Sequence, residues 1–217
     1  MPAFPNNTQR HAIFGRTGSG KTVAGLWALQ RRNYDKSPWI IIDFKGDATI
    51  AQIPGLEEIS VKSKPPKKPG LYVVRPLPGV DDDALDIMLW KIWENGKTGV
   101  FVDEGYMIPR LNKAYMSLLT QGRSKRIPII TLSQRPAWIS PWILSESEFI
   151  QVFRLTTKAD HERVAQFMPG ADVNTLNEYH SWYYNILKSE LILLAPVPRE
   201  NEILDRFDAK RVRRVWI

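Results

Sequence analysis

Eight consecutive residues near the N-terminus carry the clearest chemical pattern in the sequence. The stretch Gly15-Arg16-Thr17-Gly18-Ser19-Gly20-Lys21-Thr22 matches G-x-x-x-x-G-K-[ST] in full. Its glycines allow successive backbone N–H groups to turn inward around phosphate oxygens, and a helix that begins at the lysine adds its positive N-terminal end. We expect Lys21 to reach the β- and γ-phosphates of a nucleotide and the Thr22 hydroxyl to bind Mg²⁺. The pattern therefore predicts a nucleoside triphosphate site.

Two adjacent acids follow an apolar run about 80 residues further along the chain. The run is Gly99-Val100-Phe101-Val102, and Asp103 and Glu104 come directly after it. Burying acidic side chains at the end of a strand costs free energy unless they are paired or bind a ligand there. We expect Asp103 to hold Mg²⁺ through its water shell, and Glu104 to orient and activate an attacking water. Taken alone, the pair would also fit two solvated acids; the phosphate loop upstream favours hydrolysis.

Two more polar segments flank another apolar run, residues 127–132. After the run, the neutral amide of Gln134 is suited to sense a γ-phosphate by hydrogen bonding, although Pro136 equally indicates a simple turn. Before the run, Gly122 is followed by three cations within four residues, Arg123, Lys125 and Arg126. Such a cluster is usually a solvated surface. The sharper alternative is an arginine finger that reaches the phosphates of a neighbouring subunit.

These segments need a fold that brings the ends of several strands together. Apolar runs at 12–14, 39–42, 71–74, 99–102, 127–132 and 149–155 predict strands that are buried on both faces. Helical patterning predicts helices over 21–32, 82–95, 112–121 and 160–168. Alternation of this kind predicts an α/β fold, a single P-loop NTPase domain with a mostly parallel sheet and helices on both faces.

The C-terminal part departs from this alternation. Residues 182–187 and 191–195 predict a small hairpin, and residues 198–217 form a charged tail that contains the run Lys210-Arg211-Val212-Arg213-Arg214. We therefore divide the chain into a core, 1–197, and a charged C-terminal tail, 198–217. A second basic segment is the loop 62–68. Both segments are typical of solvated chain, and as nucleic-acid contacts they would touch phosphates rather than bases.

Composition limits the class of protein. The 217 residues carry a formal net charge of +7 with a sequence pI near 9.6, which favours polyanionic partners without requiring one. The absence of cysteine excludes a disulfide framework, cysteine-based metal sites and thiol catalysis. The longest apolar runs are far shorter than the roughly 20 residues that span a bilayer, so we expect no integral membrane segment.

The run from Gly122 to Pro136 resembles the strand-plus-glutamine segment of the FtsK–HerA superfamily of ring-forming, DNA-pumping ATPases. Three further stretches are similar to that superfamily. They are the phosphate loop, the second strand with its ending Asp43-Phe44-Lys45-Gly46-Asp47, and the segment 152–160 with the helix that follows it. The similarity spans about residues 11–168 of the 217.

The resemblance implies a RecA-like fold that binds ATP and Mg²⁺ and assembles as a homo-hexameric ring around double-stranded DNA. Contacts with the DNA would be made to its backbone without sequence specificity. By the same resemblance, Lys21 and Thr22 bind ATP and Mg²⁺, and Asp103 and Glu104 form the hydrolytic pair.

The remaining implied roles belong to residues on either side of the apolar run 127–132. Gln134 would sense the γ-phosphate, and Arg123, with Arg126 as the second candidate, would be the finger that acts in trans. A motor of 217 residues has no room for the membrane anchors or extra domains of many superfamily members. It looks most like the genome-packaging ATPases of double-stranded DNA viruses. That likeness implies a capsid or portal-vertex partner and a location in the host cytoplasm or at the virion vertex.

Three other functions compete with DNA translocation. A virion or secretion assembly ATPase without DNA pumping would use the same motor. A GTPase is suggested by D-x-x-G at Asp43–Gly46 and by a likeness to [NT]-K-x-D at Thr157–Asp160. That function would leave the acids at 103 and 104 without a role. A small-molecule kinase needs no water-activating glutamate, because its nucleophile is the acceptor substrate.

Overall fold

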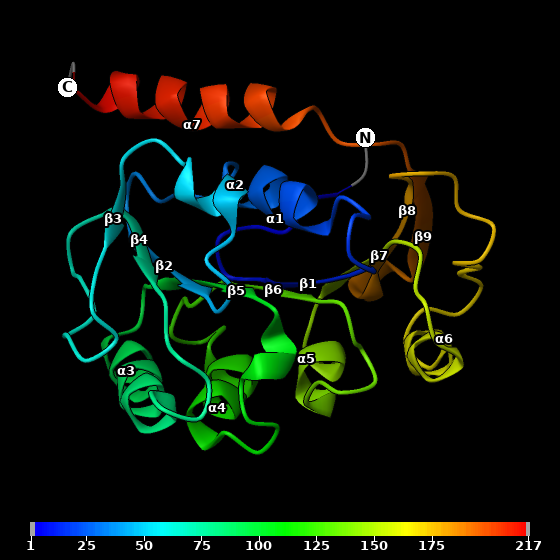
Figure 1. Cartoon of the computed structure of the whole chain (residues 1–217), viewed down its shortest axis with the longest axis horizontal. Coiled ribbons are helices and arrows are strands. Elements are labelled where there is room, and N and C mark those ends of the chain that lie inside the picture. The colour runs from blue at the N-terminus through cyan, green and yellow to red at the C-terminus, as the bar shows by residue number, and fades with distance from the viewer. Residues whose placement is uncertain (1–2, 216–217) are drawn as a thin grey trace.

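The computed structural model describes the backbone of residues 3–215 and the side chains of residues 3–208. These residues form a nine-stranded sheet that lies between two layers of helices (Figure 1). In chain order the strands are β1 (Arg10–Phe14), β2 (Pro38–Asp43), β3 (Leu56–Glu58), β4 (Gly70–Val74), β5 (Gly99–Asp103), β6 (Ile129–Ser133), β7 (Phe149–Val152), β8 (Ser181–Asn185) and β9 (Glu190–Leu194).

The sheet is mostly parallel, as the alternation of strands and helices predicts. Its spatial order is β3-β4-β2-β5-β6-β1-β7-β8-β9. Every pair from β3 across to β7 is parallel, whereas β8 pairs antiparallel with both β7 and β9. All seven parallel strands therefore end at one edge of the sheet, which we call the carboxyl edge, and begin at the opposite amino edge. The predicted C-terminal hairpin is confirmed as β8 and β9.

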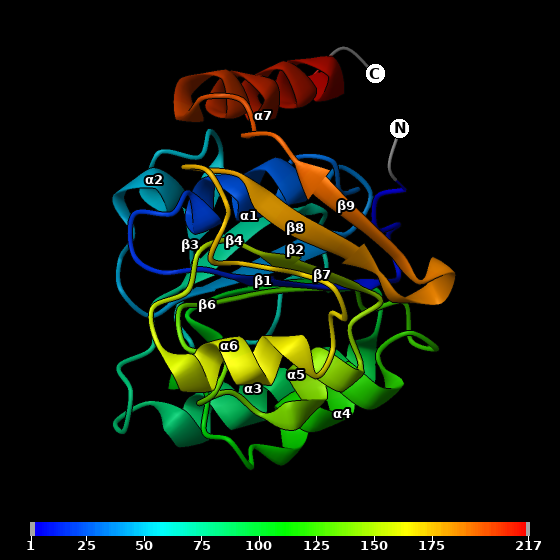
Figure 2. The same cartoon turned by 90° about the vertical axis from the view of Figure 1, so that its right-hand side faces the viewer.

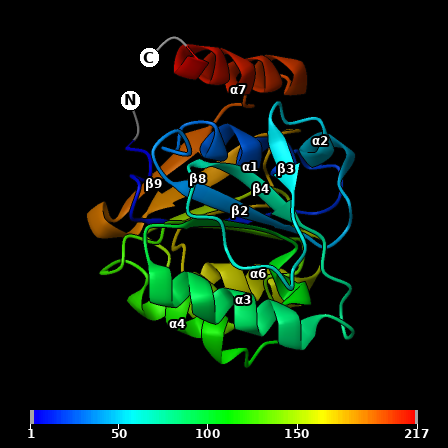
Figure 3. The same cartoon turned by 90° about the vertical axis from the view of Figure 1, so that its left-hand side faces the viewer.

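Helices cover both faces of the sheet (Figures 1, 2 and 3). On one face lie α1 (Lys21–Leu29), α2 (Ala48–Ala51) and α7 (Glu200–Val215), and on the other lie α3 (Asp82–Asn95), α4 (Lys113–Gln121), α5 (Pro141–Ser145) and α6 (Lys158–Ala165). Two 3₁₀ turns, η1 (Gly105–Met107) and η2 (Ile186–Lys188), complete the elements of the described residues. The architecture confirms the predicted α/β fold.

Successive residues of a central strand pack on opposite faces. In β2, Ile40 and Ile42 join the core beneath α3 and α4, whereas Trp39 and Ile41 join the core beneath α1. All four side chains are fully buried. Because a strand with helices on both sides has no solvent face, its sequence is apolar throughout rather than alternating. This packing fixes the positions of the strand ends that carry the polar groups.

The C-terminal segment differs from the expected charged tail. Residues 200–215 form the helix α7, and Ile203 and Phe207 are each 1% exposed in the core on the α1 face. The Phe207 ring lies 5.7 Å from that of Tyr34, centroid to centroid. The i, i+4 spacing of these two apolar residues gives the helix one buried stripe within a charged sequence. The basic run 210–214 lies outside the residues whose side chains are described.

Three short elements were not predicted from the sequence. They are β3, α2 and α5, each of three to five residues, which is too short for either periodicity to be recognised. Their local chemistry is clear once seen, since Asp47 caps α2 through the Thr49 and Ile50 N–H groups and Pro141 occupies the first turn of α5. Within the described residues, no helix is both long and apolar enough to cross a membrane.

Candidate nucleotide site

The phosphate loop connects β1 directly to α1, which confirms the predicted strand–loop–helix arrangement. Gly18 and Gly20 have φ angles of 75° and 87°, in the left-handed region that favours glycine. Gly20 also occupies the N-cap position of α1, and no side chain caps that helix. The first N–H groups of α1 are therefore open toward the loop, and they are available to a bound anion.

The parallel strands bring the predicted site residues to the carboxyl edge. β5, β6 and β1 are adjacent in the sheet, so the acids after β5, the glutamine after β6 and the loop after β1 meet there. A cavity of about 320 Å³ lies between them. Its walls include nine of the predicted residues, namely Arg16, Thr17, Gly18, Gly20, Lys21 and Thr22 of the phosphate loop together with Asp103, Glu104 and Gln134. The structure therefore brings together the nucleotide, magnesium and hydrolytic candidates.

Glu104 is the most heavily contacted group in this cavity. Its Oε1 atom accepts hydrogen bonds from Lys45 Nζ at 2.6 Å and Gln134 Nε2 at 2.7 Å. Lys21 Nζ donates to the same oxygen at 3.3 Å, and the Gln134 backbone N–H donates to Oε2 at 3.2 Å. The Glu104 backbone is left-handed, with φ at 61°. A strained backbone held by several partners is the kind of conformation that functional sites retain.

Gln134 also joins the phosphate loop to the acids. The hydroxyl of Thr17, inside the loop, donates a hydrogen bond of 2.6 Å to Gln134 Oε1. The Gln134 amide nitrogen at the same time donates to Glu104. A change in the loop caused by bound phosphate is therefore connected to the carboxylate through a single side chain. This geometry suits a sensor, and a charge would not be needed.

The environment separates the pKa values of the two adjacent acids. Burial alone would raise the pKa of Glu104, but Lys21, Lys45 and Gln134 together outweigh burial and hold that pKa below its usual range. Burial raises the pKa of Asp103 to about 6, with Lys21 opposing the rise and Glu104 adding to it. Glu104 is thus firmly ionised at neutral pH.

Asp103 fits the role of a magnesium ligand. Its side chain is 2% exposed, and its Oδ1 atom has no hydrogen-bond partner among the described residues. The Lys21 ammonium lies 3.7 Å from that oxygen. Thr22 lines the same cavity. A buried carboxylate oxygen without a donor, beside a hydroxyl, is the oxygen-rich environment that Mg²⁺ prefers.

Lys45 is a site residue that the sequence analysis did not assign. It follows β2, the neighbour of β5, and its backbone is fixed because Asp43 accepts hydrogen bonds from the Lys45 and Asp47 N–H groups. The side chain then extends to Glu104. The available signal was the run of charged residues directly after the second apolar strand, since every strand end at the carboxyl edge contributes to one site.

A second hollow adjoins the last glycine of the phosphate loop. It has a volume of about 370 Å³, and its walls are formed by Gly20, Val23, Phe153, Tyr179 and the segment 196–200 that leads into α7. Tyr179 is 49% exposed, with a left-handed φ of 59°. A Cβ atom on Gly20 would lie 3.2 Å from Tyr179 Cδ1, so the ring is in contact with the loop. No sequence pattern indicated this hollow.

Arg123 and Arg126 do not lie in the nucleotide cavity. Both are exposed, and both precede β6, whose carboxyl end at Ser133 pairs with Phe14 just before the phosphate loop. They are therefore at the amino edge, on the far side of the sheet from their own subunit's loop. Any contact of either arginine with a nucleotide would be made to a neighbouring subunit.

The guanine-binding alternative is wrong on structural grounds. Asp160, which would have to bind the base, is completely buried. Its carboxylate accepts hydrogen bonds from Arg135 Nε at 3.1 Å, the Ala137 N–H at 3.0 Å and the Thr157 hydroxyl at 2.6 Å. These contacts hold the start of α6 against the segment after β6. Asp160 therefore has a structural role and is not available to a ligand.

Comparisons with known proteins agree with this site. The chain is 42% identical to the DNA packaging ATPase P9 of Enterobacteria phage PRD1, and the match covers 97% of each chain. No protein-family model matches the chain. These relations confirm the predicted resemblance to viral packaging ATPases.

Two solved structures share the fold. The genome packaging NTPase B204 from Sulfolobus turreted icosahedral virus 2, in complex with AMPPCP, matches with a TM-score of 0.68 and 19% identity over 89% of this chain and 100% of that one. EssC (ATPases 2 and 3) from Geobacillus thermodenitrificans matches with a TM-score of 0.69 and 13% identity over 97% of this chain and 45% of that one. Fold, site and near-full-length identity lead to one assignment: the chain belongs to the family of the DNA packaging ATPase P9.

Proposed function

We propose that this protein hydrolyses ATP to drive double-stranded DNA into a viral capsid. The observation that carries the proposal is the meeting of the phosphate loop, Asp103, Glu104 and Gln134 in one cavity. It occurs in a chain that is 42% identical to a DNA packaging ATPase. A relative at that identity over nearly its whole length supports the same reaction and the same polymer substrate.

Hydrolysis requires Glu104 to exchange partners. Lys21 and Lys45 both contact its carboxylate, so the group is ionised but occupied. Triphosphate in the loop would draw Lys21 toward the β- and γ-phosphates, leaving Glu104 with Lys45 and Gln134. The freed side of the carboxylate then accepts the proton of an attacking water, while the Gln134 amide responds to the γ-phosphate.

Mg²⁺ completes the site in this proposal. Thr22 and Asp103 would hold it, the threonine by its hydroxyl and the aspartate through water. When bound, the ion neutralises charge on the β- and γ-phosphate oxygens. The carboxylate oxygen of Asp103 that lacks a donor supports this assignment. Its pKa of about 6 leaves Asp103 mostly ionised at neutral pH, and a nearby divalent cation would favour the ionised form further.

The hollow beside Gly20 is suited to the nucleobase. It opens next to the loop that would hold the phosphates, and aromatic and apolar side chains form most of its wall. Ligand pockets of a few hundred Å³ with such walls are typical of small organic groups. The Tyr179 ring, in contact with Gly20, would stack on the base.

The proposed active form is a ring of identical subunits. Because Arg123 is exposed at the amino edge, it would act in trans on the triphosphate of the next subunit in a homo-hexamer. The ring would dock on a capsid or portal-vertex protein, in the host cytoplasm or at the virion vertex.

The test is an ATPase assay with and without double-stranded DNA, run beside particle imaging for rings. We expect duplex of any sequence to raise the hydrolysis rate and the stimulation to fall with salt. Hydrolysis by intact rings that duplex does not stimulate at low salt would favour an assembly ATPase. The matched control is Lys21→Ala, which removes the lysine of the phosphate loop. It should abolish ATP hydrolysis both with and without DNA.

A further inference from the structure

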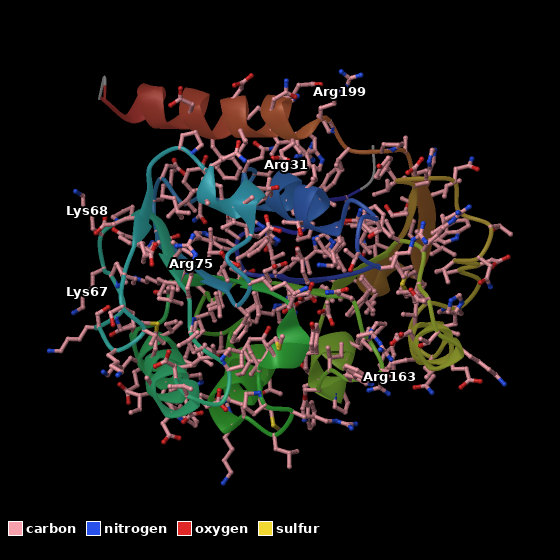
Figure 4. All side chains as sticks on the ribbon, viewed as in Figure 1. Arg31, Lys67, Lys68, Arg75, Arg163 and Arg199 are labelled. Atoms are coloured by element: carbon pink, nitrogen blue, oxygen red, sulfur yellow. The ribbon has the colours of Figure 1, made fainter. Side chains whose placement is uncertain are left out.

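The amino edge carries a surface that the nucleotide chemistry does not use. An open cavity of about 640 Å³ lies there, on the opposite side of the sheet from the phosphate loop. Four of its lining residues are cations, namely Lys36, Lys67, Lys97 and Arg126. We call these four residues the amino-edge surface. All four are exposed, and Figure 4 shows Lys67 and the adjacent Lys68 pointing away from the body of the molecule.

The four cations form a row because of the strand order. Each precedes a different strand, with Lys67 before β4, Lys36 before β2, Lys97 before β5 and Arg126 before β6. These strands are consecutive neighbours in the sheet. Adjacent strands lie about 4.8 Å apart, so the row extends over about 14 Å. Segments that are far apart in the sequence are thereby combined into one linear array of positive charge.

The row is not neutralised by the protein. No acidic residue lines the cavity, and within residues 3–208 none of the four cations forms an ion pair. The cations at the carboxyl edge behave differently, since Lys21 and Lys45 both contact Glu104. Four unpaired cations in a row repel one another, and a bound polyanion would relieve that repulsion.

Two members of the row have constrained backbones. Lys97 and Arg126 have left-handed φ angles of 52° and 57°, which are uncommon for residues other than glycine. The Lys97 N–H donates to the Lys125 carbonyl at 2.9 Å, so the entry segments of β5 and β6 are joined. Strain at positions that a packed scaffold holds in place is characteristic of binding sites. The backbones of Lys97 and Arg126 are therefore held at the starts of neighbouring strands.

We infer that the amino-edge surface binds the phosphate backbone of double-stranded DNA during translocation. The inference rests on the proposed function, because it identifies where the proposed substrate is held. Duplex DNA carries one charge per about 1.7 Å of axis, so a 14 Å row meets a length that carries about eight phosphates. The row reads no base, and contacts made to phosphates alone suit a motor that must move any sequence.

The geometry favours a polymer over a small anion. A free phosphate or nucleotide is bound by converging donors at a helix N-terminus or a closed loop, as at the carboxyl edge. Here the cations are arranged along a line in an open cavity, each on its own strand. Basic sequence segments that looked like separate solvated loops, 62–68 and 122–126, both contribute to it.

The experiment compares two triple variants in the full-length protein. The first, K36Q/K67Q/K97Q, removes three charges from the row and leaves the candidate finger residues intact. We expect the duplex concentration that gives half-maximal ATPase stimulation to rise at least tenfold at about 100 mM salt. The slope of log affinity against log salt should fall in magnitude by about 3, since each phosphate contact contributes about 0.9. The ATPase rate without DNA should not change.

The matched control, K113Q/K158Q/K188Q, removes three exposed lysines that lie outside the row. It should remain within twofold of the wild type in every measurement. If the wild type responds to duplex and the two variants have equal affinity and equal salt slopes, the assignment of this surface is wrong. If the wild type itself neither binds duplex nor responds to it, the proposed function fails first, and the inference fails with it.

An acidic protein segment is the competing occupant of this surface. Poly-L-glutamate serves as the probe, because it carries charge without the geometry of a duplex. A K36Q/K67Q/K97Q variant that binds duplex like the wild type but no longer binds poly-L-glutamate would overturn the inference. The inference is supported if the variant's fold-loss of affinity for duplex is at least ten times its fold-loss of affinity for poly-L-glutamate.

Discussion

The two edges of the sheet use charge in opposite ways. At the carboxyl edge, Lys21 and Lys45 converge on Glu104 at 3.3 and 2.6 Å, in a cavity that also contains a buried aspartate. At the amino edge, the four cations of the amino-edge surface lie side by side, with no acid in the cavity that they line. In the first arrangement, Lys21 and Lys45 form ion pairs with Glu104, and Lys21 also pairs with Asp103. The second is an array of like charges that faces solvent.

The difference follows from what each edge has to do. Paired charges in a partly dry cavity tune reactivity, because each partner shifts the pKa or the orientation of the next. Salt screens these paired charges little, because they are partly buried. Unpaired charges in water are screened strongly, so their attraction for a polyanion falls steeply as salt rises. We therefore expect salt between about 50 and 200 mM to reduce DNA stimulation while it leaves hydrolysis without DNA nearly unchanged.

The largest expected effect tests whether the two edges meet across a subunit boundary. Arg123→Ala should lower turnover by about 10³-fold while nucleotide binding persists, because a finger stabilises charge only in the transition state. Turnover and binding of a fluorescent ATP analogue measure the two separately. In rings assembled from wild-type and Arg123→Ala subunits, the loss of activity should exceed the fraction of variant subunits, because each variant subunit also disables its neighbour's site.

Two companion variants sharpen that test. Arg126→Ala should have the smaller effect on turnover, and the reverse order would assign the finger to Arg126. Lys188→Ala removes an exposed charge elsewhere and should change nothing. If both arginine variants turn over within threefold of the wild type, the amino edge has no part in hydrolysis, and the two edges are functionally separate.

The next largest effect lies entirely within the carboxyl edge. Glu104→Gln should reduce hydrolysis by at least 10²-fold, because the amide cannot accept the proton of the attacking water. ATP binding should persist or tighten, since Lys21 loses its closer carboxylate contact, at 3.3 Å, and keeps only the contact with Asp103 at 3.7 Å. Single-turnover hydrolysis and retention of bound ATP provide the measurement. Glu162→Gln, at an exposed pair with Lys158, is the control, and appreciable turnover in the Glu104 variant would contradict the assignment.

A smaller effect is expected beside the same cavity. Tyr179→Ala should weaken ATP binding about tenfold, which is within the range for loss of one base-stacking contact. Binding of inorganic tripolyphosphate should be unchanged, because the Tyr179 ring lines the hollow proposed for the base and not the phosphate site. Tyr179→Phe keeps the ring and should bind ATP like the wild type. Equal weakening for ATP and tripolyphosphate would mean that Tyr179 supports the loop and does not contact the base.

The sequence predicts the carboxyl edge better than the amino edge. The phosphate loop has fixed spacing, and the acids after β5 and the glutamine after β6 stand directly after apolar runs. Each is a local pattern that needs only the rule that parallel strands end at one edge. Lys45 was missed because its role depends on which strand neighbours β5, and strand order is not written in any local pattern.

The amino-edge surface could not have been predicted from local patterns. Its members come from four entry segments, and Lys36 and Lys97 are single lysines with no basic neighbours in the sequence. Tyr179 likewise lies in an irregular segment that only the fold brings to Gly20. The helix α7 was not predicted for a different reason. Charged residues dominate its sequence, and only two of its described residues, Ile203 and Phe207, belong to the core.

The smallest expected effect concerns a histidine beneath the amino edge. His11 in β1 is 3% exposed, and within the described residues neither of its ring nitrogens has a hydrogen-bond partner. Its ring meets the edge of Tyr183 at 5.7 Å, and the nearby Arg32 guanidinium adds positive charge. Burial first, and Arg32 second, lower the pKa of His11 to about 3. The folded protein therefore holds this imidazole neutral.

Acid should destabilise the fold through this residue. The unfolded chain binds a proton at His11 near pH 6.5, whereas the folded chain does so only near pH 3, so the free energy of unfolding falls as the pH drops below 6.5. By pH 5.5 the loss should be on the order of 1 kcal/mol relative to pH 7.5. Urea unfolding at the two pH values in the wild type and in His11→Leu isolates the contribution, because the leucine cannot titrate. If the two proteins lose the same stability over this range, His11 is not the group that links folding to pH, and the positive charge beneath the amino edge has no measurable cost.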